Sequence, residues 1–456
     1  MSERKFNVIT PLQFFFKKVV NGSVLLFLAT TVAMVIANSS ISDWYNNLLS
    51  HPINFQIGSL SLFSHHGQNL TLIQFVNDAL MAVFFFLIGL EIKREILVGE
   101  LSSMKKATLP IIAALGGMII PVLVFYLICN EAPASHGIAI PIATDIAFAL
   151  GVLALLGKRV PLGMKVFLTA LAVVDDIGGI LVIALFYGGE IGIEPLLISA
   201  VLLAVTYAGG KIGIANKYFY YILAFIIWMM FLESGLHPTI AGVLVGLTIP
   251  ARPKFDTKLF LQNMRDTLET FPEEGKLSSK RATVLTHKQI YTLKHMETMA
   301  RKTISPLQEI ADDLEPLVHY FVLPLFAFVN AGITFDNLTF SLVGVPVAIF
   351  SGLFIGKAVG IFCFSYVFLK SGLVNIPTGM NYKNLFAVSI LGGIGFTVSL
   401  FIANLSYADI PEVGVSLLNE AKIGVFAGSL VSGLVGYFLL NKTLPAASTE
   451  EIEPKN

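Results

Sequence analysis

Charged residues are scarce in this chain. Of its 456 residues, 13% are Asp, Glu, Lys or Arg, about half the share that is usual in a soluble domain. Basic and acidic residues number 30 each, so the net charge is zero and no nucleic-acid partner is indicated. The chain is 55% hydrophobic, with a mean hydropathy of +0.77. This composition predicts a protein that has the lipid bilayer as its solvent.

Cysteine is nearly absent as well. Only Cys129 and Cys363 occur, each in or beside an apolar run. This excludes a disulfide framework and a thiol metal site. A cleavage motif of small residues is also missing after the first apolar run, which follows Lys17 and Lys18. We therefore expect that run to be a retained helix and not a signal peptide.

Long apolar runs bounded by charges or turn residues predict an all-α membrane protein of about twelve spans, since a helix needs about 20 apolar residues to cross a bilayer. The predicted spans are approximately 19–38, 73–90, 107–129, 138–156, 164–187, 195–210, 218–232, 234–250, 317–335, 341–369, 384–406 and 418–440. Glycine and proline interrupt several of them.

Lysine and arginine are missing from one side of these spans. None occurs between Val19 and Ile92, or in the short connections after the third, fifth, seventh and ninth spans. Basic residues gather in the connections on the other side, and an excess of Lys and Arg marks the cytoplasmic side. Both termini are therefore predicted to be cytoplasmic.

The predicted spans divide the chain into consecutive segments. These are a cytoplasmic N-terminus at 1–18, spans one to eight at 19–250, a cytoplasmic connection at 251–315, spans nine to twelve at 316–440 and a cytoplasmic tail at 441–456. The connection carries eleven Lys and Arg residues and is expected to be a solvated, partly helical segment. Within the outside loop at 39–72, Ile53–Leu62 alternates with period two, which predicts a small β-hairpin.

Four ionisable residues stand out inside the predicted spans, namely Asp145, Asp175, Asp176 and Lys357. One Asp at the centre of a span costs roughly 2.5–3.5 kcal/mol to insert. Buried ion pairs that hold helices together are one explanation, but here three acids face one lysine. The surplus negative charge requires protons or metal ions. The sequence therefore favours a cation and proton site over purely structural pairs.

Asp175 and Asp176 are neighbours, so their side chains point about 100° apart on a helix. One carboxylate can face a water-filled funnel while the other faces a neighbouring helix. Na⁺ and Li⁺ prefer oxygen ligands, which the carboxylates, the Thr144 hydroxyl and freed backbone carbonyls supply. Burial and mutual repulsion favour binding of protons by the same pair. A site that holds either Na⁺ or protons, but not both, is the minimum that exchange requires.

Glycine and proline interrupt two spans near these residues. Pro141 and Gly151 bracket Asp145, and the sequence LGGIGFT at 391–397 interrupts the eleventh span. Interrupted helices at corresponding positions of inverted repeats point to a transporter's binding site. Spans three to five and ten to twelve are the candidate repeats, with Asp145 offsetting positive helix ends and Lys357 negative ones. Close helix packing is the alternative explanation of the glycines.

Several motifs together closely resemble NhaA-type sodium/proton antiporters. They are TDIAFALG at 144–151, ALAVVDDIGG at 170–179, IGK at 355–357, GIGFT at 393–397, NDALMAVFF at 77–85, GLEIKRE at 89–95 and LPLFAF at 323–328. The resemblance implies twelve helices, of which the fourth and eleventh are discontinuous and cross. It also implies exchange of cytoplasmic Na⁺ or Li⁺ for external H⁺ across a bacterial inner membrane, electrogenic and pH-regulated, with no cofactor.

The resemblance also assigns roles to single residues. It makes Asp175 and Asp176 the carriers of the ion and the protons, Lys357 the partner of Asp175, and Asp145 the residue that balances helix ends. It implies a homodimer formed through the outer hairpin.

A part in pH-dependent activation is likewise implied for four residues, Glu91, Arg94, Glu95 and His237. Without the resemblance, the first three are an ordinary charge cluster at a helix end, and His237 is a histidine at the membrane interface. The chain departs from the family pattern at 311–316, which reads ADDLEP and has no histidine before His319.

Two other classes of protein also fit some of these features. An intramembrane aspartyl protease also needs two aspartates, but on different helices, and its Gly-x-Gly-Asp motif is absent from this chain. A passive cation channel usually builds selectivity from rings of symmetry-related groups, whereas this set of residues is asymmetric within one chain. The sequence therefore predicts a transporter and not an enzyme.

Overall fold

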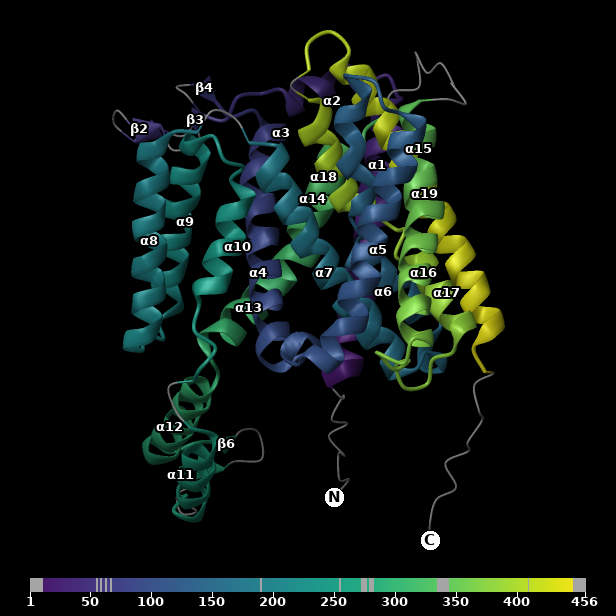
Figure 1. The fold of residues 1–456 in the computed structure, drawn as a ribbon. Coiled ribbons are helices and arrows are strands. Elements are labelled where there is room, and N and C mark those ends of the chain that lie inside the picture. Colours follow the sequence, from purple (N-terminus) through teal and green to yellow (C-terminus); the bar gives the residue numbers. More distant parts are fainter. Residues whose placement is uncertain are drawn as a thin grey trace.

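The protein is almost entirely helical. The computed structural model describes residues 11–445 apart from 55, 58–59, 62–63, 66–67, 189–190, 254–255, 272–276, 279–282, 334–343 and 409. Figure 1 shows most helices running up and down beside one another, with the start of α1 (Pro11–Ala37) and the end of α19 (Gly414–Thr443) on the same, lower side. This is the arrangement of a multi-pass helical protein.

The remaining helices of the first half are α2 (Ser42–Leu49), α3 (Leu72–Phe75), α4 (Met81–Val98), α5 (Met104–Ile128), α6 (Ile146–Leu155), α7 (Leu162–Phe186), α8 (Ile193–Ile212), α9 (Lys217–Ser234) and α10 (Thr239–Thr248). Those of the second half are α11 (Thr257–Glu269), α12 (His287–Thr303), α13 (Pro306–Leu317), α14 (Leu323–Asn330), α15 (Val345–Ser351), α16 (Lys357–Lys370), α17 (Tyr382–Leu391) and α18 (Phe396–Tyr407). Tighter or wider turns join some of them: 3-10 helices η2 (Glu100–Ser102), η3 (Ala134–Ile142) and η4 (Gly157–Arg159), and π-helices η1 (Val76–Leu80), η5 (Val318–Val322) and η6 (Gly352–Gly356).

Among the described residues, seven helices are long and apolar enough to cross a membrane, and counting three bent pairs as one span each gives up to ten. The pairs are Gly22–Ala37 with α2, bent by 116°, and η3 with α6 and α17 with α18, bent by 45° each. Each of the twelve predicted spans overlaps a helix or such a pair. The total of twelve crossings itself stays a prediction.

Apolar side chains cover the outside of these helices. Leu127 and Leu185 are 82% and 77% exposed, and many other large apolar residues are similarly uncovered. Soluble monomers rarely expose apolar patches of more than a few hundred Å². Lipid therefore covers these faces, which makes the chain a multi-pass membrane protein.

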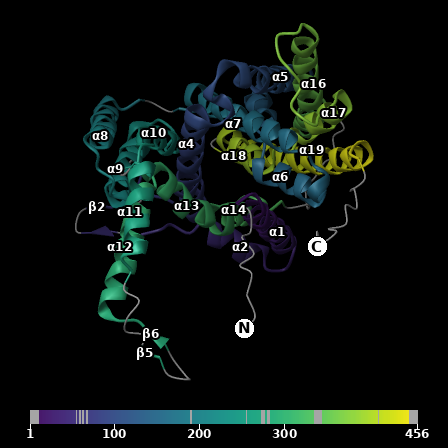
Figure 2. The same cartoon turned by 90° about the horizontal axis from the view of Figure 1, so that it is seen from below.

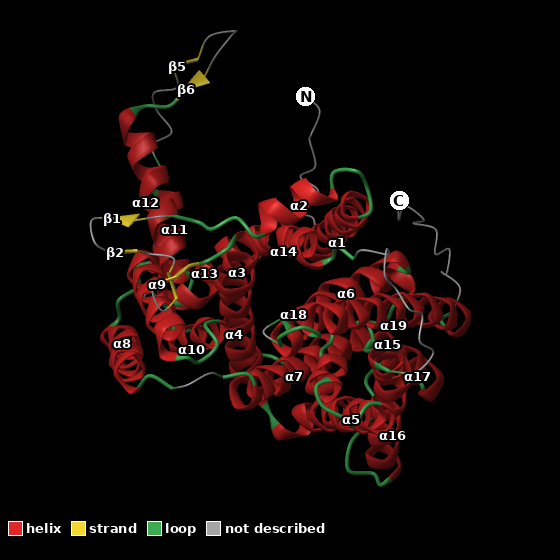
Figure 3. Cartoon of the chain, turned by 90° about the horizontal axis from the view of Figure 1, so that it is seen from above, coloured by secondary structure: helices red, strands yellow, loops and turns green. Residues whose placement is uncertain are grey.

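The helices fall into two groups when viewed along their axes (Figures 2 and 3). One, here called the row, contains α1, α2, α4, α8, α9, α10, α13 and α14. The other, here called the bundle, contains α5, η3 with α6, α7, α15 with α16, α17 with α18, and α19. The two groups touch where α1 meets α6, where α4 meets α7 and where α14 meets α18.

Glycine allows a close helix crossing in the bundle. A Cβ on Gly360 of α16 would lie 2.1 Å from the Gly116 carbonyl oxygen of α5, and one on Gly116 would lie 2.2 Å from the Gly360 oxygen. Only glycine at both positions lets these two backbones meet, as is common where membrane helices pack. This contact fixes α16, and with it Lys357, against α5.

The two 45° bends lie at corresponding positions of the predicted repeats. The first break is at Ala143–Asp145, two residues after Pro141, and the second is at Gly392–Gly395. Gly151 lies inside α6, where an added Cβ would come within 2.9 Å of the Ser23 hydroxyl of α1. Close packing therefore explains Gly151, whereas the chain breaks next to Pro141.

Short strands occur in the predicted outer loop. β1 (Gln56–Ile57) pairs with β2 (Leu60–Ser61), and β3 (Ser64–His65) pairs with β4 (Gln68–Asn69), both antiparallel and two residues long. The residues that join the members of each pair lie outside the described part of the chain. A β-hairpin that acts as a packed unit stays a prediction.

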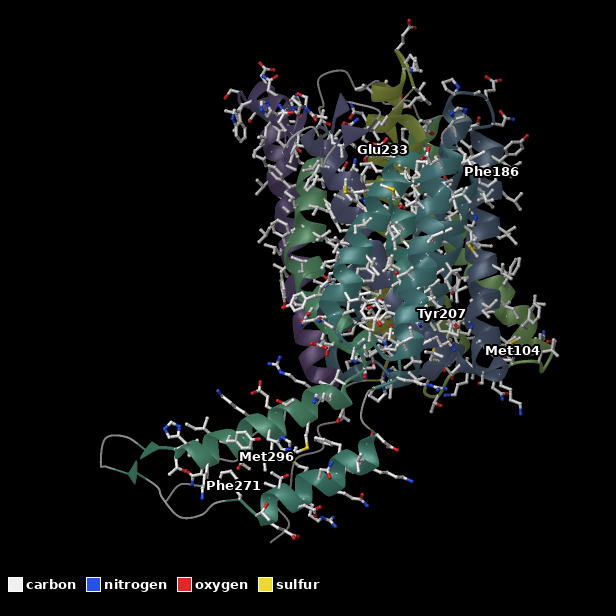
Figure 4. All side chains as sticks on the ribbon, turned by 90° about the vertical axis from the view of Figure 1, so that its left-hand side faces the viewer. Met104, Phe186, Tyr207, Glu233, Phe271 and Met296 are labelled. Atoms are coloured by element: carbon white, nitrogen blue, oxygen red, sulfur yellow. The ribbon has the colours of Figure 1, made fainter. Side chains whose placement is uncertain are left out.

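The predicted cytoplasmic connection contains a helical extension, α11 and α12, which pack on each other. A two-stranded pair, β5 (Leu277–Ser278) with β6 (Thr283–Val284), lies between them in the sequence. Figure 4 shows the extension, marked by Phe271 and Met296, projecting from the ends of the membrane helices. α13 begins inside the predicted connection and packs against α4 and α9 of the row.

Candidate functional site

The two helix breaks meet in the middle of the bundle. The backbone N–H of Asp145 donates to the Ile394 carbonyl at 2.6 Å. The Thr144 hydroxyl of the first break lies 2.8 Å from the Gly392 carbonyl of the second. Each break thus supplies hydrogen-bond partners for the backbone groups that the other leaves free.

Asp145 caps two helices at once. Its Oδ1 accepts a hydrogen bond from Phe148 N–H at 3.1 Å, in the first turn of α6. Its Oδ2 accepts from the N–H and the hydroxyl of Thr397, at 3.1 and 2.5 Å, in the first turn of α18. A carboxylate beside two helix N-termini is favourably placed, because each N-terminus carries a partial positive charge.

Asp175 forms the second polar centre, half-way along α7. Its Oδ2 lies 2.5 Å from Lys357 Nζ and 2.7 Å from the Thr144 hydroxyl, and Lys357 also donates to that hydroxyl at 2.8 Å. All three side chains are fully buried. Lys357 directly follows the π-helical turn η6, a kind of turn that is frequent at functional sites. The structure therefore brings together three residues that the sequence singled out, two from the helices α7 and α16 and one from the first helix break.

One oxygen of Asp175 remains free. Oδ1 is buried and has no hydrogen-bond partner among the described residues. A carboxylate oxygen in that position is suited to a cation or a proton, because a buried polar atom without a partner is otherwise unfavourable.

Asp176 faces a cavity instead of the ion pair. The cavity has a volume of about 80 Å³, and its lining includes Asp176, Asp145, Thr144, Glu91, Glu95 and His319. Asp176 is buried, with 5% of its surface exposed. The adjacent carboxylates therefore lie in different surroundings, as their angular separation on the helix requires.

Within the described residues, no group of three or more His, Cys, Asp or Glu side chains is arranged to hold a metal ion tightly. Asp175, Asp176 and Thr144 each offer oxygen atoms, the ligand type that a hard monovalent cation prefers.

The residues implied in pH regulation lie in two places. Glu91, Arg94 and Glu95, on the last turns of α4, all line the cavity. His237 lies apart, between α9 and α10, where its Nδ1 is 2.8 Å from the Thr239 hydroxyl and its Nε2 is 3.7 Å from Asp78 Oδ1.

Sequence reasoning gave no role to two residues that the structure places beside the aspartates. His319 lines the cavity and its Nδ1 lies 2.8 Å from the Glu315 carbonyl. Thr397 binds Asp145, as described above. Thr397 is the second residue of α18 and not its N-cap, so it carries no standard helix-start signal, and nothing in the sequence marks His319 as a neighbour of α4.

On the side of the site away from Glu91, the bundle closes against the row. Phe401 of α18 packs against Phe85 of α4 and Phe326 of α14, with ring centroids 5.7 and 6.3 Å apart. One turn further on, Asn404 donates to Asn330 of α14 at 2.8 Å. Asn330 in turn donates to Asn77 of η1 at 2.8 Å.

Buried carboxylates at the crossing of two discontinuous helices, in a multi-pass helical protein, define the class of secondary ion transporters. The family described as Na⁺/H⁺ antiporter 1 matches residues 13–440 of the chain. The chain belongs to this family.

Individual relatives agree. The chain is 58% identical to the Na⁺/H⁺ antiporter NhaA of Parabacteroides distasonis, over 99% of this chain and 100% of that protein. It is 51% identical to the Na⁺/H⁺ antiporter NhaA of Porphyromonas gingivalis W83, over 98% and 99%, and 42% identical to the Na⁺/H⁺ antiporter NhaA 2 of Syntrophotalea carbinolica, over 95% and 96%. The family predicted from the motifs is confirmed, and so is its class, since antiporters are transporters and not enzymes.

Replacement of Lys357 tests its part in the site. We expect Lys357→Ala to lower the melting temperature strongly, because removing one partner of a buried ion pair costs about 3–5 kcal/mol. Lys357→Arg keeps the positive charge and should retain exchange that responds to membrane potential, with altered ion affinity or pH dependence. Thermal melting and transport current of both variants give the answer.

Lys422 provides the matched control. It is a buried lysine of α19 whose Nζ donates to the Gly332 carbonyl at 3.2 Å and not to a carboxylate. Lys422→Ala should destabilise the protein less than Lys357→Ala. A Lys357→Ala protein with unchanged melting and full electrogenic transport would rule out a role for Lys357 as counter-charge or as proton carrier.

Proposed function

We propose that the protein exchanges cytoplasmic Na⁺ or Li⁺ for external H⁺, and that cation and protons compete for Asp175 and Asp176. The free Oδ1 of Asp175, buried next to a second carboxylate that lines a cavity, carries this proposal. Two adjacent carboxylates in a dry site cannot both remain charged without a cation or protons. Occupancy by one therefore excludes the other, which couples the two ions.

Lys357 and Thr144 position Asp175 for this competition. The lysine keeps one oxygen of Asp175 in a fixed place and offsets its charge, while the other oxygen is left for the ion. When Na⁺ binds, the carboxylates release protons towards the cavity. When Na⁺ leaves, protons restore the balance of charge.

The cavity gives the site access from one side at a time. Its outer lining residues, Glu91, Arg94 and Glu95, lie on the end of α4 that joins the basic, predicted cytoplasmic connections. For the site to open to the other side of the membrane, the bundle and the row must separate at the contacts made by Phe401 and Asn404. Movement of one helical unit against another around a fixed site is the general mode of such transporters.

Regulation and assembly belong to the same proposal. Charged groups on α4 and His319 of η5 lie around the cavity that leads to Asp176, so they contribute to the local potential at the site. We assign pH-dependent activation to Glu91, Arg94 and Glu95, and a second pH-sensitive contact to His237. A homodimer formed through the outer strands and a location in the bacterial inner membrane complete the proposal.

The first test concerns the carriers. Asp175→Asn and Asp176→Asn keep the size of the side chain and remove its charge, so each should abolish proton movement driven by a sodium gradient. The measurement uses proteoliposomes with an imposed sodium gradient and an internal pH dye. Asp313→Asn, on the half-exposed Lys217–Asp313 ion pair, is the control and should leave exchange intact. Near-normal exchange by either Asn variant would show that its aspartate is not a carrier.

The second test concerns charge movement. If two protons exchange for one Na⁺, each turnover moves one net charge, and 100 mV is worth about 2.3 kcal/mol for that charge. Such a potential should change the sodium gradient at which exchange stops by roughly fiftyfold. The measurement clamps proteoliposomes with potassium and valinomycin. A stopping gradient that ignores the potential would mean one-for-one, electroneutral exchange.

The third test concerns access. In a protein freed of Cys129 and Cys363, a short reducible thiol crosslinker between Asn330→Cys and Asn404→Cys should stop exchange, because it ties the row to the bundle. A reductant should restore it. The control crosslink joins Asn330→Cys to Asn77→Cys, inside the row, and should leave exchange running. Continued exchange with the first pair fully crosslinked would contradict alternating access through this contact.

A further inference from the structure

Helix α19 lies along the second helix break and turns two hydroxyl groups towards it. Ser429 and Ser432 lie three residues apart, so they share one face of the helix. Both are buried, at 7% and 0% exposure. Neither residue touches Asp175, Asp176 or Lys357, and the motifs in the sequence draw no attention to either.

Ser429 binds the backbone of the break directly. Its Oγ accepts hydrogen bonds from Gly395 N–H at 3.2 Å and from Phe396 N–H at 3.1 Å. These groups lie at the start of α18, where N–H groups have no partner within the helix. Gly395, the residue before the helix, has no side chain that could cap it. A side chain from another helix therefore does the capping.

Ser429 and Asp145 divide the start of α18 between them. Asp145 takes the Thr397 N–H, and Ser429 takes the two N–H groups before it. A carboxylate in place of Ser429 would add a second buried negative charge at the helix start that Asp145 already caps. A hydroxyl supplies an acceptor without that charge.

Water cannot easily replace this hydroxyl. Ser429 borders a groove between α1, α6 and α19 that is lined mainly by apolar side chains, among them Phe27, Phe148 and Leu430. Space at the break is also limited, since a Cβ on Gly395 would lie 2.1 Å from Ser399 Oγ. Loss of the hydroxyl would leave two buried N–H groups without partners, which is unfavourable in an apolar environment.

The break that Ser429 holds leads to the ion site. Gly392 and Ile394, inside the break, present their carbonyl oxygens to Thr144 and to the Asp145 N–H. Thr144 in turn contacts Asp175 and Lys357. We propose that Ser429 is a positioning residue for transport, which fixes the 392–395 break so that Thr144 and Asp175 keep the geometry that binds the cation. This inference rests on the proposed use of Asp175 as the cation site.

The test compares Ser429→Ala with two other variants in proteoliposomes. Ser429→Ala should raise the KM for Na⁺ roughly tenfold, about the effect of losing hydrogen bonds to buried donors, with a smaller change in maximal rate. Ser429→Thr keeps the hydroxyl and should keep the KM of the parent protein. Ser432→Ala is the matched control, because the Ser432 hydroxyl faces the same break and has no hydrogen-bond partner among the described residues. Its KM should not change.

The outcomes separate the inference from the proposed function. If the unaltered protein shows no exchange, the proposed function fails. If it exchanges ions and Ser429→Ala has the KM of Ser432→Ala, the positioning role is overturned, and a fall in melting temperature with an unchanged KM overturns it as well. If Ser429→Ala does not fold, Ser429→Cys, with its weaker acceptor, should fold and show a raised KM. A parent-like KM in that variant would also overturn the inference.

Discussion

Backbone groups freed inside the membrane must find partners, and the rest of this structure depends on how that requirement is met. Two helices stop and restart in the bundle, so N–H and carbonyl groups become available where no water can solvate them. Asp145, Thr144 and Ser429 supply the partners, and each break also binds the other. The polar pocket this creates is what allows Asp175 and Asp176 to be buried in the same place.

The charge in the pocket is kept unbalanced. Lys357 offsets one aspartate, and Asp145 is engaged by two helix starts, so Asp176 and one oxygen of Asp175 are the groups that the proposed mechanism leaves for a cation or protons. In that mechanism the imbalance of charge is what couples the two ions.

Local sequence chemistry predicts the residues at the centre of the candidate site, whose roles in transport stay a proposal. Charged residues are rare in apolar runs, which makes Asp145, Asp175, Asp176 and Lys357 conspicuous. Glycine and proline in the sequence indicate both helix breaks. Ser429, His319 and the chain of Asn77, Asn330 and Asn404 could not be predicted, since their importance arises from contacts between distant parts of the chain. The sequence suggests Gly151 as part of a helix break, but in the structure its small size allows α6 to pack on α1.

The double capping by Asp145 also has an evolutionary consequence. Its carboxylate joins Phe148, in the helix that follows one break, to Thr397, in the helix that follows the other, although Asp145 and Thr397 lie 252 positions apart in the sequence. Residues that share a hydrogen-bond network do not contribute independently to stability. Whether a substitution is tolerated at one break will therefore depend on which residues occupy the other. We expect the two halves of the chain to change together in evolution, and chimaeras that combine halves of distant relatives to be less stable.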